Sequence, residues 1–386
     1  MSVYILGGAR TPQGSFLGSL STVPAPKLGS VAIEGALENA KISKEKVKEV
    51  FMGNVLQAGV GQAPARQATL FAGLSEDVQT TTVNKVCGSG MQSVILGAKS
   101  ILCDDKDIVV AGGMENMSLA PHLLPNSRSG FKFGETQLKD AMQWDGLWDV
   151  YSNRAMGNCA EECTKKYDLT REAQDNYAIE SFKRAQKAQA DGVFKSEIKP
   201  VTIKTRKGDI EVSEDEGPGK VMFDKVPSLR PAFDKEGTIT AANASTINDG
   251  ACALVLGGES VKDQAKFKIL GWAGHAQNPT WFTTAPVEAV RKNLAKLDLS
   301  VEDIDYWEIN EAFAAVSMVA INELKLNQEK VNVHGGGVSL GHPIGTSGAR
   351  IILSLMNVLE RNNGKRGCAA ICIGGGEALS IVIERM

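Results

Sequence analysis

The sequence contains one pattern twice, and this duplication limits the fold more than any other feature. Residues 32–54 (AIEGALENAKISKEKVKEVFMGN) align without a gap with residues 289–311 (AVRKNLAKLDLSVEDIDYWEINE). Each copy has the pattern of an amphipathic helix, a serine before acidic residues, and a β-like run. A second pair, residues 109–118 and 371–380, follows in the same order with an offset larger by five residues. We therefore predict a chain built from two related halves.

Helical patterns alternate with β-branched runs in both halves, which predicts an α/β fold with a mixed sheet in each half. The sequence between the halves has a different pattern. It contains two helical stretches, near 155–167 and 171–191, and a long hydrophilic run. We interpret it as an inserted, loop-rich domain, after which residues 250–258 (GACALVLGG) return as a strand to the first sheet. The predicted domains are 1–119 with 249–269, the insertion 120–248, and 270–386.

The composition indicates a globular protein with a large core, because 43% of the 386 residues are hydrophobic and 23% are charged. The net charge of −3 gives no electrostatic reason to expect nucleic acid or an anionic membrane as partner. No apolar run approaches 18 residues, which argues against a membrane-spanning helix. Seven scattered cysteines suit a reducing compartment, so we expect a cytoplasmic protein.

Cys87, in VNKVCGSGMQS (83–93), lies between a β-like run and an amphipathic helical pattern. A thiol at a helix N-terminus is expected to have a lowered pKa, because the helix dipole favours the thiolate. The small residues after Cys87 would let a substrate approach the backbone. Taken alone, the pattern fits a buried structural cysteine at a tight turn equally well.

Three further residues lie in similar settings. His342, one of four histidines, stands in the glycine-rich run GHPIGTSGAR (341–350), and a neutral imidazole is the usual base that activates a cysteine. Cys372 ends a β-like run before three glycines, whose N–H groups can line an oxyanion pocket. Asn310, in EINEAFA, is on local grounds best interpreted as a helix N-cap.

The other cysteines indicate no site. Cys159 and Cys163 have helical spacing, but no second pair completes a zinc site, so no metal is expected. The remaining three fit core positions: Cys103, Cys252 and Cys368.

Four motifs together, NKVCGSGMQS, NEAFA, NVHGGGVSLGHPIGTSGA and CIGGG, closely resemble the thiolase family in order and spacing. The resemblance runs from GGARTP (7–12) to the end of the chain. It implies duplicated α/β halves with mixed sheets stacked in layers, and an inserted domain that binds coenzyme A. The NKVCGSG text resembles the biosynthetic short-chain branch, which implies acetyl-CoA C-acetyltransferase activity: condensation of two acetyl-CoA to acetoacetyl-CoA, and the reverse thiolysis.

The resemblance also implies a role for each motif. His342 would take the proton of Cys87, which then carries the acetyl group, and Cys372 would take a proton from the second acetyl-CoA. One oxyanion hole would be His342 with a water held by Asn310, and the other the N–H groups of Cys87 and Gly374. Ser245, in TITAANASTINDGA (238–251), matches the position that binds the pantetheine arm. No metal or redox cofactor is implied, since the coenzyme A thioester is the substrate.

Three positions depart from the family pattern. Ala155, before Met156, stands where short-chain enzymes often have histidine, which predicts extra room in the acyl pocket, whereas Phe282 would narrow it. Pro218 stands where potassium-responsive relatives have tyrosine, so we expect no potassium site. The residues whose carbonyl groups would complete such a site are present: Ala241, Ala242, Ala244 and Val338.

Three other functions are compatible with parts of the sequence. A degradative 3-ketoacyl-CoA thiolase with a broader chain-length range would use the same residues. A decarboxylating condensing enzyme needs no second thiol, so Cys372 argues against it. A non-catalytic acyl-CoA- or lipid-binding member would not need all four motifs intact. The family also forms dimers and tetramers, and we expect a homotetramer here.

Overall fold

One sheet runs through both halves of the chain in the computed structural model, which describes residues 2–104 and 106–386. Its order is β14-β15-β16-β13-β1-β12-β5-β3-β4, and the short β2 pairs with β12. The halves meet where the start of β1 pairs with the start of β13. The strands are β1 (Val3–Arg10), β2 (Gly14–Ser15), β3 (Glu49–Gly53), β4 (Gln79–Val83), β5 (Ile108–Asn116), β12 (Asn248–Gly257), β13 (Phe267–Ala276), β14 (Tyr306–Ile309), β15 (Arg366–Ile373) and β16 (Glu377–Arg385).

The predicted duplication is present in the topology. In the first half β1-β12-β5-β3 and in the second half β13-β16-β15-β14 pair in the same order, with two antiparallel pairings followed by a parallel one. Even the edge strand β4 has a counterpart, because Val331 forms a parallel bridge to Trp307. The two halves are therefore related strand by strand.

The register corrects the second sequence match. Met52 lies opposite Gly112, and its repeat partner Ile309 lies opposite Ala370. Gly112 therefore corresponds to Ala370, an offset only one residue larger than that of the first block. The glycines of residues 112–113 are inside a buried strand and are not equivalent to the glycine turn after Cys372. Two glycine-rich segments can be aligned in several registers, so their similarity alone does not fix which residues correspond.

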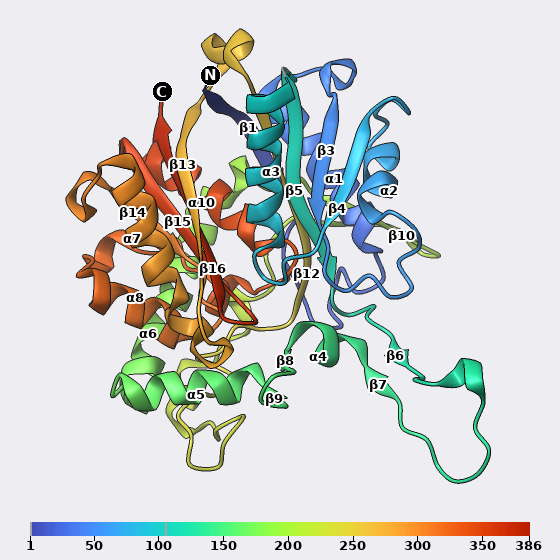
Figure 1. Cartoon of the computed structure of the whole chain (residues 1–386), viewed down its shortest axis with the longest axis vertical. Helices are drawn as coiled ribbons and strands as arrows, with labels where there is room; N and C mark the ends of the chain where they lie inside the picture. The colour runs from blue at the N-terminus through green and yellow to red at the C-terminus, as the bar shows by residue number, and fades with distance from the viewer. Residues whose placement is uncertain (1, 105) are drawn as a thin grey trace.

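The helices and the sheet form five layers, as Figure 1 shows from side to side. Helices α1 and α2 cover the outer face of the first half, and α7 and α8 cover that of the second. Between the two halves of the sheet lie α3 and α10, whose apolar residues contact both. The prediction of stacked α/β layers is confirmed. The bounds are α1 (Ala25–Ala40), α2 (Pro64–Phe71), α3 (Ser89–Asp104), α7 (Ala285–Leu297), α8 (Ala314–Leu324), α9 (Gly337–Leu340) and α10 (Ser347–Arg361).

The middle helix α3 is apolar over an unusual length. The segment Val86–Cys103 is long and apolar enough to cross a membrane by composition alone. In this structure it lies between the two halves of the sheet, and more than half of it is buried. Its apolar character is thus explained by the core that it fills.

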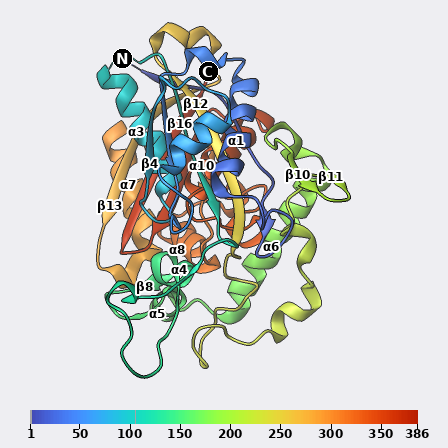
Figure 2. The same cartoon turned by 90° about the vertical axis from the view of Figure 1, so that its right-hand side faces the viewer.

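The insertion is rich in loops, as predicted, and covers one end of the layers. Its helices α5 and α6 coincide with the two predicted helical stretches, and its hydrophilic run forms the β10–β11 hairpin that projects in Figure 2. The chain then returns as β12 between β1 and β5. The elements are β6 (His122–Leu123), β7 (Lys139–Asp140), α4 (Ala141–Gly146), β8 (Trp148–Asp149), β9 (Arg154–Ala155), α5 (Met156–Lys166), α6 (Arg171–Ala190), β10 (Val201–Thr205) and β11 (Gly208–Val212).

The predicted start of the second half needs a small correction. β13 begins at Phe267, and its first three residues already pair with β16. A boundary at residue 270 would divide β13, so the second half begins at or before Phe267. The Gly257–Gly258 pair marks the end of β12, but no glycine or proline between it and Phe267 marks the start of β13.

Candidate active site

Cys87 lies in a tight turn that leads into α3. The Ser89 hydroxyl closes this turn, because it donates to the Val86 carbonyl (2.6 Å) and accepts from the Lys85 N–H (2.8 Å). Val86 has a φ of +46°, a strained value for a β-branched residue. Such strain is concentrated at functional sites, where surrounding structure holds it. The turn leaves the half-buried Cys87 at the wall of a cavity.

The glycines around Cys87 serve packing, which the sequence did not predict. A Cβ atom on Gly90 would lie 2.7 Å from the backbone nitrogen of Ala349, and one on Gly348 would lie 2.4 Å from that of Met91. The N-termini of α3 and α10 therefore cross in direct contact. A Cβ on Gly88 would lie 2.5 Å from the Ile373 side chain. Close approach of two protein segments, and not of a substrate, requires these small residues.

His342 is held in the loop before α10. Its backbone N–H lies 3.3 Å from both the Thr246 carbonyl and Asn248 Oδ1. Its Nδ1 is 2.5 Å from the Ser347 hydroxyl, and its Nε2 is 3.4 Å from Asn310 Nδ2. Neither Asn248 nor Ser347 was predicted from the sequence, although Ser347 lies within the GHPIGTSGAR motif.

Asn310 directly follows β14, whereas α8 begins at Ala314, so the N-cap interpretation is wrong. The Asn310 Oδ1 atom is buried and has no hydrogen-bond partner among the described residues. An orphaned buried acceptor beside an imidazole suits a water or a substrate atom. The structure therefore brings Asn310 into the site beside His342.

Two buried carboxylates, both missed from sequence, hold the loops of the site together. Glu115 on β5 accepts from the N–H groups of Val55, Leu56 and Gly345, and burial raises its pKa to about 7. Glu311 connects the NEAFA segment to α6 and to the α9 loop. The donors to Glu311 are Tyr177, Ser181, Asn332 and the N–H of Val338.

Cys372 and Gly374 lie at the end of β15 beside Cys87. The Cys372 side chain is almost fully buried. Burial raises the pKa of the Cys372 thiol well above its ordinary value, and the neighbouring Cys87 raises it further. The Gly374 N–H donates to the Cys87 thiol, an interaction that lowers the pKa of Cys87. Both thiols therefore belong to one site.

The electrostatics correct one expectation about Cys87. Burial raises the pKa of its thiol to about 11, which outweighs the N–H groups of Gly374 and of Cys87 itself. Burial, together with the nearby Arg350, lowers the pKa of His342 to about 3. At neutral pH the site thus holds a neutral thiol and a neutral imidazole, not an ion pair. The proton must leave Cys87 as the sulfur reacts.

A cavity of about 250 Å³ opens onto these groups. Its walls are mainly apolar, and it includes the predicted pocket residues Met156, Phe282 and Ser245 together with Cys87, His342 and Gly374. Asn310 and Cys372 are each 1% exposed and adjoin lining residues.

Ala155 is not among the residues that line this cavity. It lies in β9, where it pairs with Trp148 of β8, one residue before α5 begins. The prediction that Ala155 enlarges the acyl pocket assumed that this residue lines the pocket, and in the structure it does not. The sequence could not show this because the β8–β9 pairing is not evident in it.

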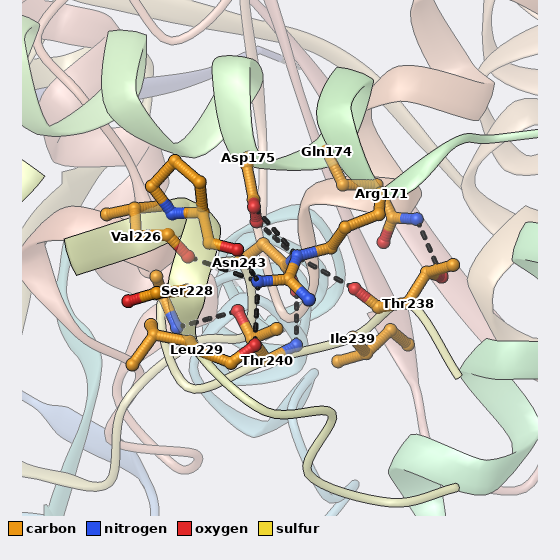
Figure 3. Close-up of polar contacts among 12 residues, drawn as sticks. Arg171, Gln174, Asp175, Val226, Ser228, Leu229, Thr238, Ile239, Thr240 and Asn243 are labelled. Carbon is orange, nitrogen blue, oxygen red and sulfur yellow. Dashed lines mark hydrogen bonds and ion pairs between the residues drawn. The ribbon is translucent and has the colours of Figure 1, made fainter. Parts of the chain in front are cut away.

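The wall that carries Ser245 is fixed by a polar cluster shown in Figure 3. Arg171 on α6 pairs with Asp175 (2.7 Å) and donates to the backbone carbonyl groups of Val226 (3.1 Å) and Leu229 (2.9 Å). Asn243 donates to Asp175 (2.9 Å). The cluster thereby ties two loops of the insertion to α6, next to the cavity.

A second hollow of about 300 Å³ shares Thr246 with the first. Lys220 and Lys225 stand on its wall. Three of the four residues that would complete a potassium site also line it, namely Ala241, Ala242 and Val338, whereas Ala244 lines the first cavity. Within residues 2–104 and 106–386, no group of three or more His, Cys, Asp or Glu is arranged to hold a metal ion.

Comparison with known proteins gives two family matches that together span the chain. The description "Thiolase, N-terminal domain" matches residues 3–260, and "Thiolase, C-terminal domain" matches residues 263–385. The chain belongs to the thiolase family. This confirms the resemblance that the four motifs indicated.

This thiolase is similar to proteins named acetyl-CoA acetyltransferase. A cytosolic one from Gibberella zeae is 50% identical over 390 residues, which cover 100% of this chain and 98% of the relative. A mitochondrial one from Rattus norvegicus is also 50% identical, over 100% of this chain and 91% of the relative. A crystal structure of the Acat5 thiolase from Ascaris suum in complex with coenzyme A is 43% identical, with a TM-score of 0.95 and full coverage of both chains.

Proposed function

We propose that this thiolase is an acetyl-CoA C-acetyltransferase, which condenses two acetyl-CoA to acetoacetyl-CoA and free coenzyme A and catalyses the reverse thiolysis. The observation that carries the proposal is the placement of two thiols at one site: Cys87 lines a small apolar cavity with His342, and the buried Cys372 lies beside Cys87. The relatives with that name, at about 50% identity over the whole chain, support it.

In the first half-reaction, the Cys87 sulfur attacks the carbonyl carbon of acetyl-CoA while His342 Nε2 takes the thiol proton. The C–S bond to coenzyme A breaks, and an acetyl-cysteine remains. The leaving coenzyme A thiolate takes the proton of Cys372, whose thiolate is otherwise disfavoured by burial. The products of this step are acetyl-Cys87, an imidazolium and a Cys372 thiolate.

In the second half-reaction, the Cys372 thiolate takes a proton from the methyl carbon of a second acetyl-CoA. The resulting enolate attacks acetyl-Cys87, forms the new C–C bond and releases the Cys87 thiolate, which regains its proton from His342. We assign the two developing oxyanions to His342 with a water on Asn310, and to the N–H groups of Cys87 and Gly374. Loss of one such donor typically costs about 10²–10³ in rate.

Coenzyme A would lie along the two neighbouring hollows, which share Thr246. The apolar first cavity, with Ser245 on its wall, suits the acyl group and the pantetheine arm. Lys220 and Lys225 beside the second hollow offer positive charge to the phosphates. No metal or redox cofactor takes part in this scheme.

We also propose a homotetramer and a cytoplasmic location, as inferred from sequence. Relatives are named both cytosolic and mitochondrial, so the location is tested by imaging a tagged chain. A long segment of the insertion reaches away from the body in Figure 1 and exposes large apolar side chains: Leu124, Phe131, Phe133 and Leu138. Such exposure suits burial against other subunits. Light scattering should give four chains, and a monomer would contradict this.

The chain-length range separates the proposal from a degradative 3-ketoacyl-CoA thiolase. The cavity of about 250 Å³ and the buried Phe282 favour short acyl chains. Thiolysis of 3-ketoacyl-CoAs of increasing length should give the highest kcat/KM for four to six carbons. A maximum at ten or more carbons would favour the degradative enzyme.

A further inference from the structure

The helices α3 and α10 begin with equivalent serines, Ser89 and Ser347. The offset between them equals the offset between Gly112 and Ala370, which the strand register sets. Each serine is the first residue of its helix and stands beside one of the two crossing glycines, Gly90 and Gly348. The duplication therefore provides an internal reference for the hydrogen bonds that such a serine makes.

The hydrogen bonds of Ser89 have unambiguous directions. Its hydroxyl donates to the Val86 carbonyl oxygen, which can only accept. Its oxygen accepts from the backbone N–H of Lys85, which can only donate. The first copy thus uses its hydroxyl as donor to the preceding turn and as acceptor from a nitrogen just upstream.

Ser347 makes a related but shifted pair of contacts: its hydroxyl reaches the carbonyl four residues upstream, where Ser89 reaches the one three residues upstream, and a side-chain nitrogen replaces the upstream backbone N–H. Its hydroxyl donates to the Pro343 carbonyl at 3.0 Å, and its oxygen lies 2.5 Å from His342 Nδ1. Ser347 is fully buried. The Pro343 carbonyl also accepts the N–H groups of Thr346 and Ser347. By analogy with Ser89, we assign the single hydroxyl proton to this carbonyl, and the short contact to Nδ1 then places the ring hydrogen on Nδ1.

The other ring nitrogen has a consistent partner. Asn310 Nδ2 lies 3.4 Å from His342 Nε2, and with the amide in this orientation its N–H needs a lone pair on Nε2. The polar chain then runs in one direction, from Asn310 through His342 and Ser347 to the Pro343 carbonyl. Within this chain, His342 and Ser347 each accept one hydrogen bond and donate one.

We propose that Ser347 is a positioning residue that holds His342 in the tautomer with hydrogen on Nδ1, so that the Nε2 lone pair is available to take the proton of Cys87. This inference rests on the proposed role of His342 as the base. The choice of tautomer matters because the ring is neutral at rest: burial and the Arg350 charge on α10 lower its pKa. When Nε2 takes the proton, the Nδ1–H bond to Ser347 stays unchanged, so the reaction needs no rearrangement behind the ring.

The direct test is ¹⁵N NMR of the full-length protein labelled at histidine, which distinguishes protonated from unprotonated ring nitrogens. The chain has only four histidines, and a His342→Asn variant assigns the signal. In the wild type we expect His342 with hydrogen on Nδ1. In Ser347→Ala we expect the hydrogen on Nε2, because Nδ1–H would lose its buried acceptor, and the Asn310 amide can turn its unpartnered Oδ1 toward Nε2–H.

The matched control is Ser89→Ala, which removes the equivalent hydroxyl from the other helix and should leave the His342 tautomer unchanged. Ser347→Ala should lower kcat for acetoacetyl-CoA thiolysis by about 10–100-fold, a typical loss for such a supporting contact. Its KM should change little, and Ser347→Thr should recover part of kcat.

Hydrogen on Nε2 in the wild type would overturn the proposal, and this measurement does not depend on whether any variant folds. A Ser347→Ala protein that keeps hydrogen on Nδ1 would overturn it too. The outcome is separable from the proposed function: a wild type with the expected tautomer but without thiolysis activity would contradict the function and leave the tautomer assignment standing.

Discussion

The two helix N-termini of the middle layer have the same architecture and different chemistry. At each, a serine closes the preceding turn, and the following glycine allows backbone contact with the other helix. The turn before α3 carries Cys87, the proposed nucleophile, whereas the loop before α10 carries His342, the proposed base. The comparison teaches that packing requirements preserved the serine and the glycine in both copies, while the neighbouring positions diverged into complementary reactive groups.

Equivalent positions at the ends of the strands also carry different residues in the two halves. Asn310 and Cys372 of the second half correspond to Gly53 and Met114 of the first. Position 53 is restricted to glycine, because a Cβ there would lie 2.7 Å from the Gly345 carbonyl oxygen. Met114 is fully buried in the apolar cluster under α1 and α2. The first half therefore supplies one reactive side chain and the second half three, and the site exists only where they pack together.

Cys372→Ala tests this division with the largest expected effect. Condensation and thiolysis should fall by more than about 10³-fold, since the thiolate proposed to take the methyl proton is lost. Acetylation of Cys87 should persist, and the corresponding Met114→Leu change should leave activity within about threefold. The measurement is deuterium exchange into the methyl group of acetyl-CoA. Exchange at the wild-type rate would assign the proton transfer to another group.

Substitutions at the helix crossing test whether the two glycines are equivalent. Gly90→Ala and Gly348→Ala should each destabilise the fold by about 1–3 kcal/mol, because both new methyl groups meet backbone atoms. Urea unfolding measures this. Gly219→Ala is the control, because nothing lies within 4 Å of a Cβ atom there. If either crossing variant unfolds at the same urea concentration as the control, the crossing does not require glycine at that position.

The family and the layered α/β fold were predictable because short local motifs carry them, and the structure brings the four residues of those motifs together: Cys87, Asn310, His342 and Cys372. Ser347, Asn248 and Glu115 were missed because their importance comes from contacts with other segments. The pKa of Cys87 was predicted to be lowered, but it is raised. The local sequence shows that the residue lies at a helix N-terminus, but it does not show how deeply the thiol is buried. Ala155 was placed in the pocket by analogy, and a strand pairing that the sequence does not reveal places it elsewhere.

The pH dependence of Cys87 alkylation distinguishes a neutral pair from an ion pair. A thiol whose pKa is raised to about 11 is ionised in only a small fraction at neutral pH. The rate of inactivation by iodoacetamide should therefore rise about tenfold per pH unit from pH 7 to pH 9. A plateau within this range would show a preformed thiolate beside His342.

The smallest expected effect concerns potassium. Pro218 has no side-chain oxygen, and its carbonyl already accepts from Gln186 at 2.7 Å. Thiolysis rates in KCl and NaCl at equal ionic strength should agree within about twofold, because the remaining carbonyl groups coordinate a weakly hydrated cation poorly. A several-fold gain in KCl alone would require a potassium site.

In the proposed reaction, the first half of the chain carries the acyl group and the second half supplies the base. The most direct measurement is mass spectrometry of the protein quenched after mixing with acetyl-CoA, followed by peptide mapping. We predict one acetyl group, on the peptide that contains Cys87, present in Cys372→Ala and absent in Cys87→Ser. An acetyl group on Cys372, or one that remains in Cys87→Ser, would contradict the account.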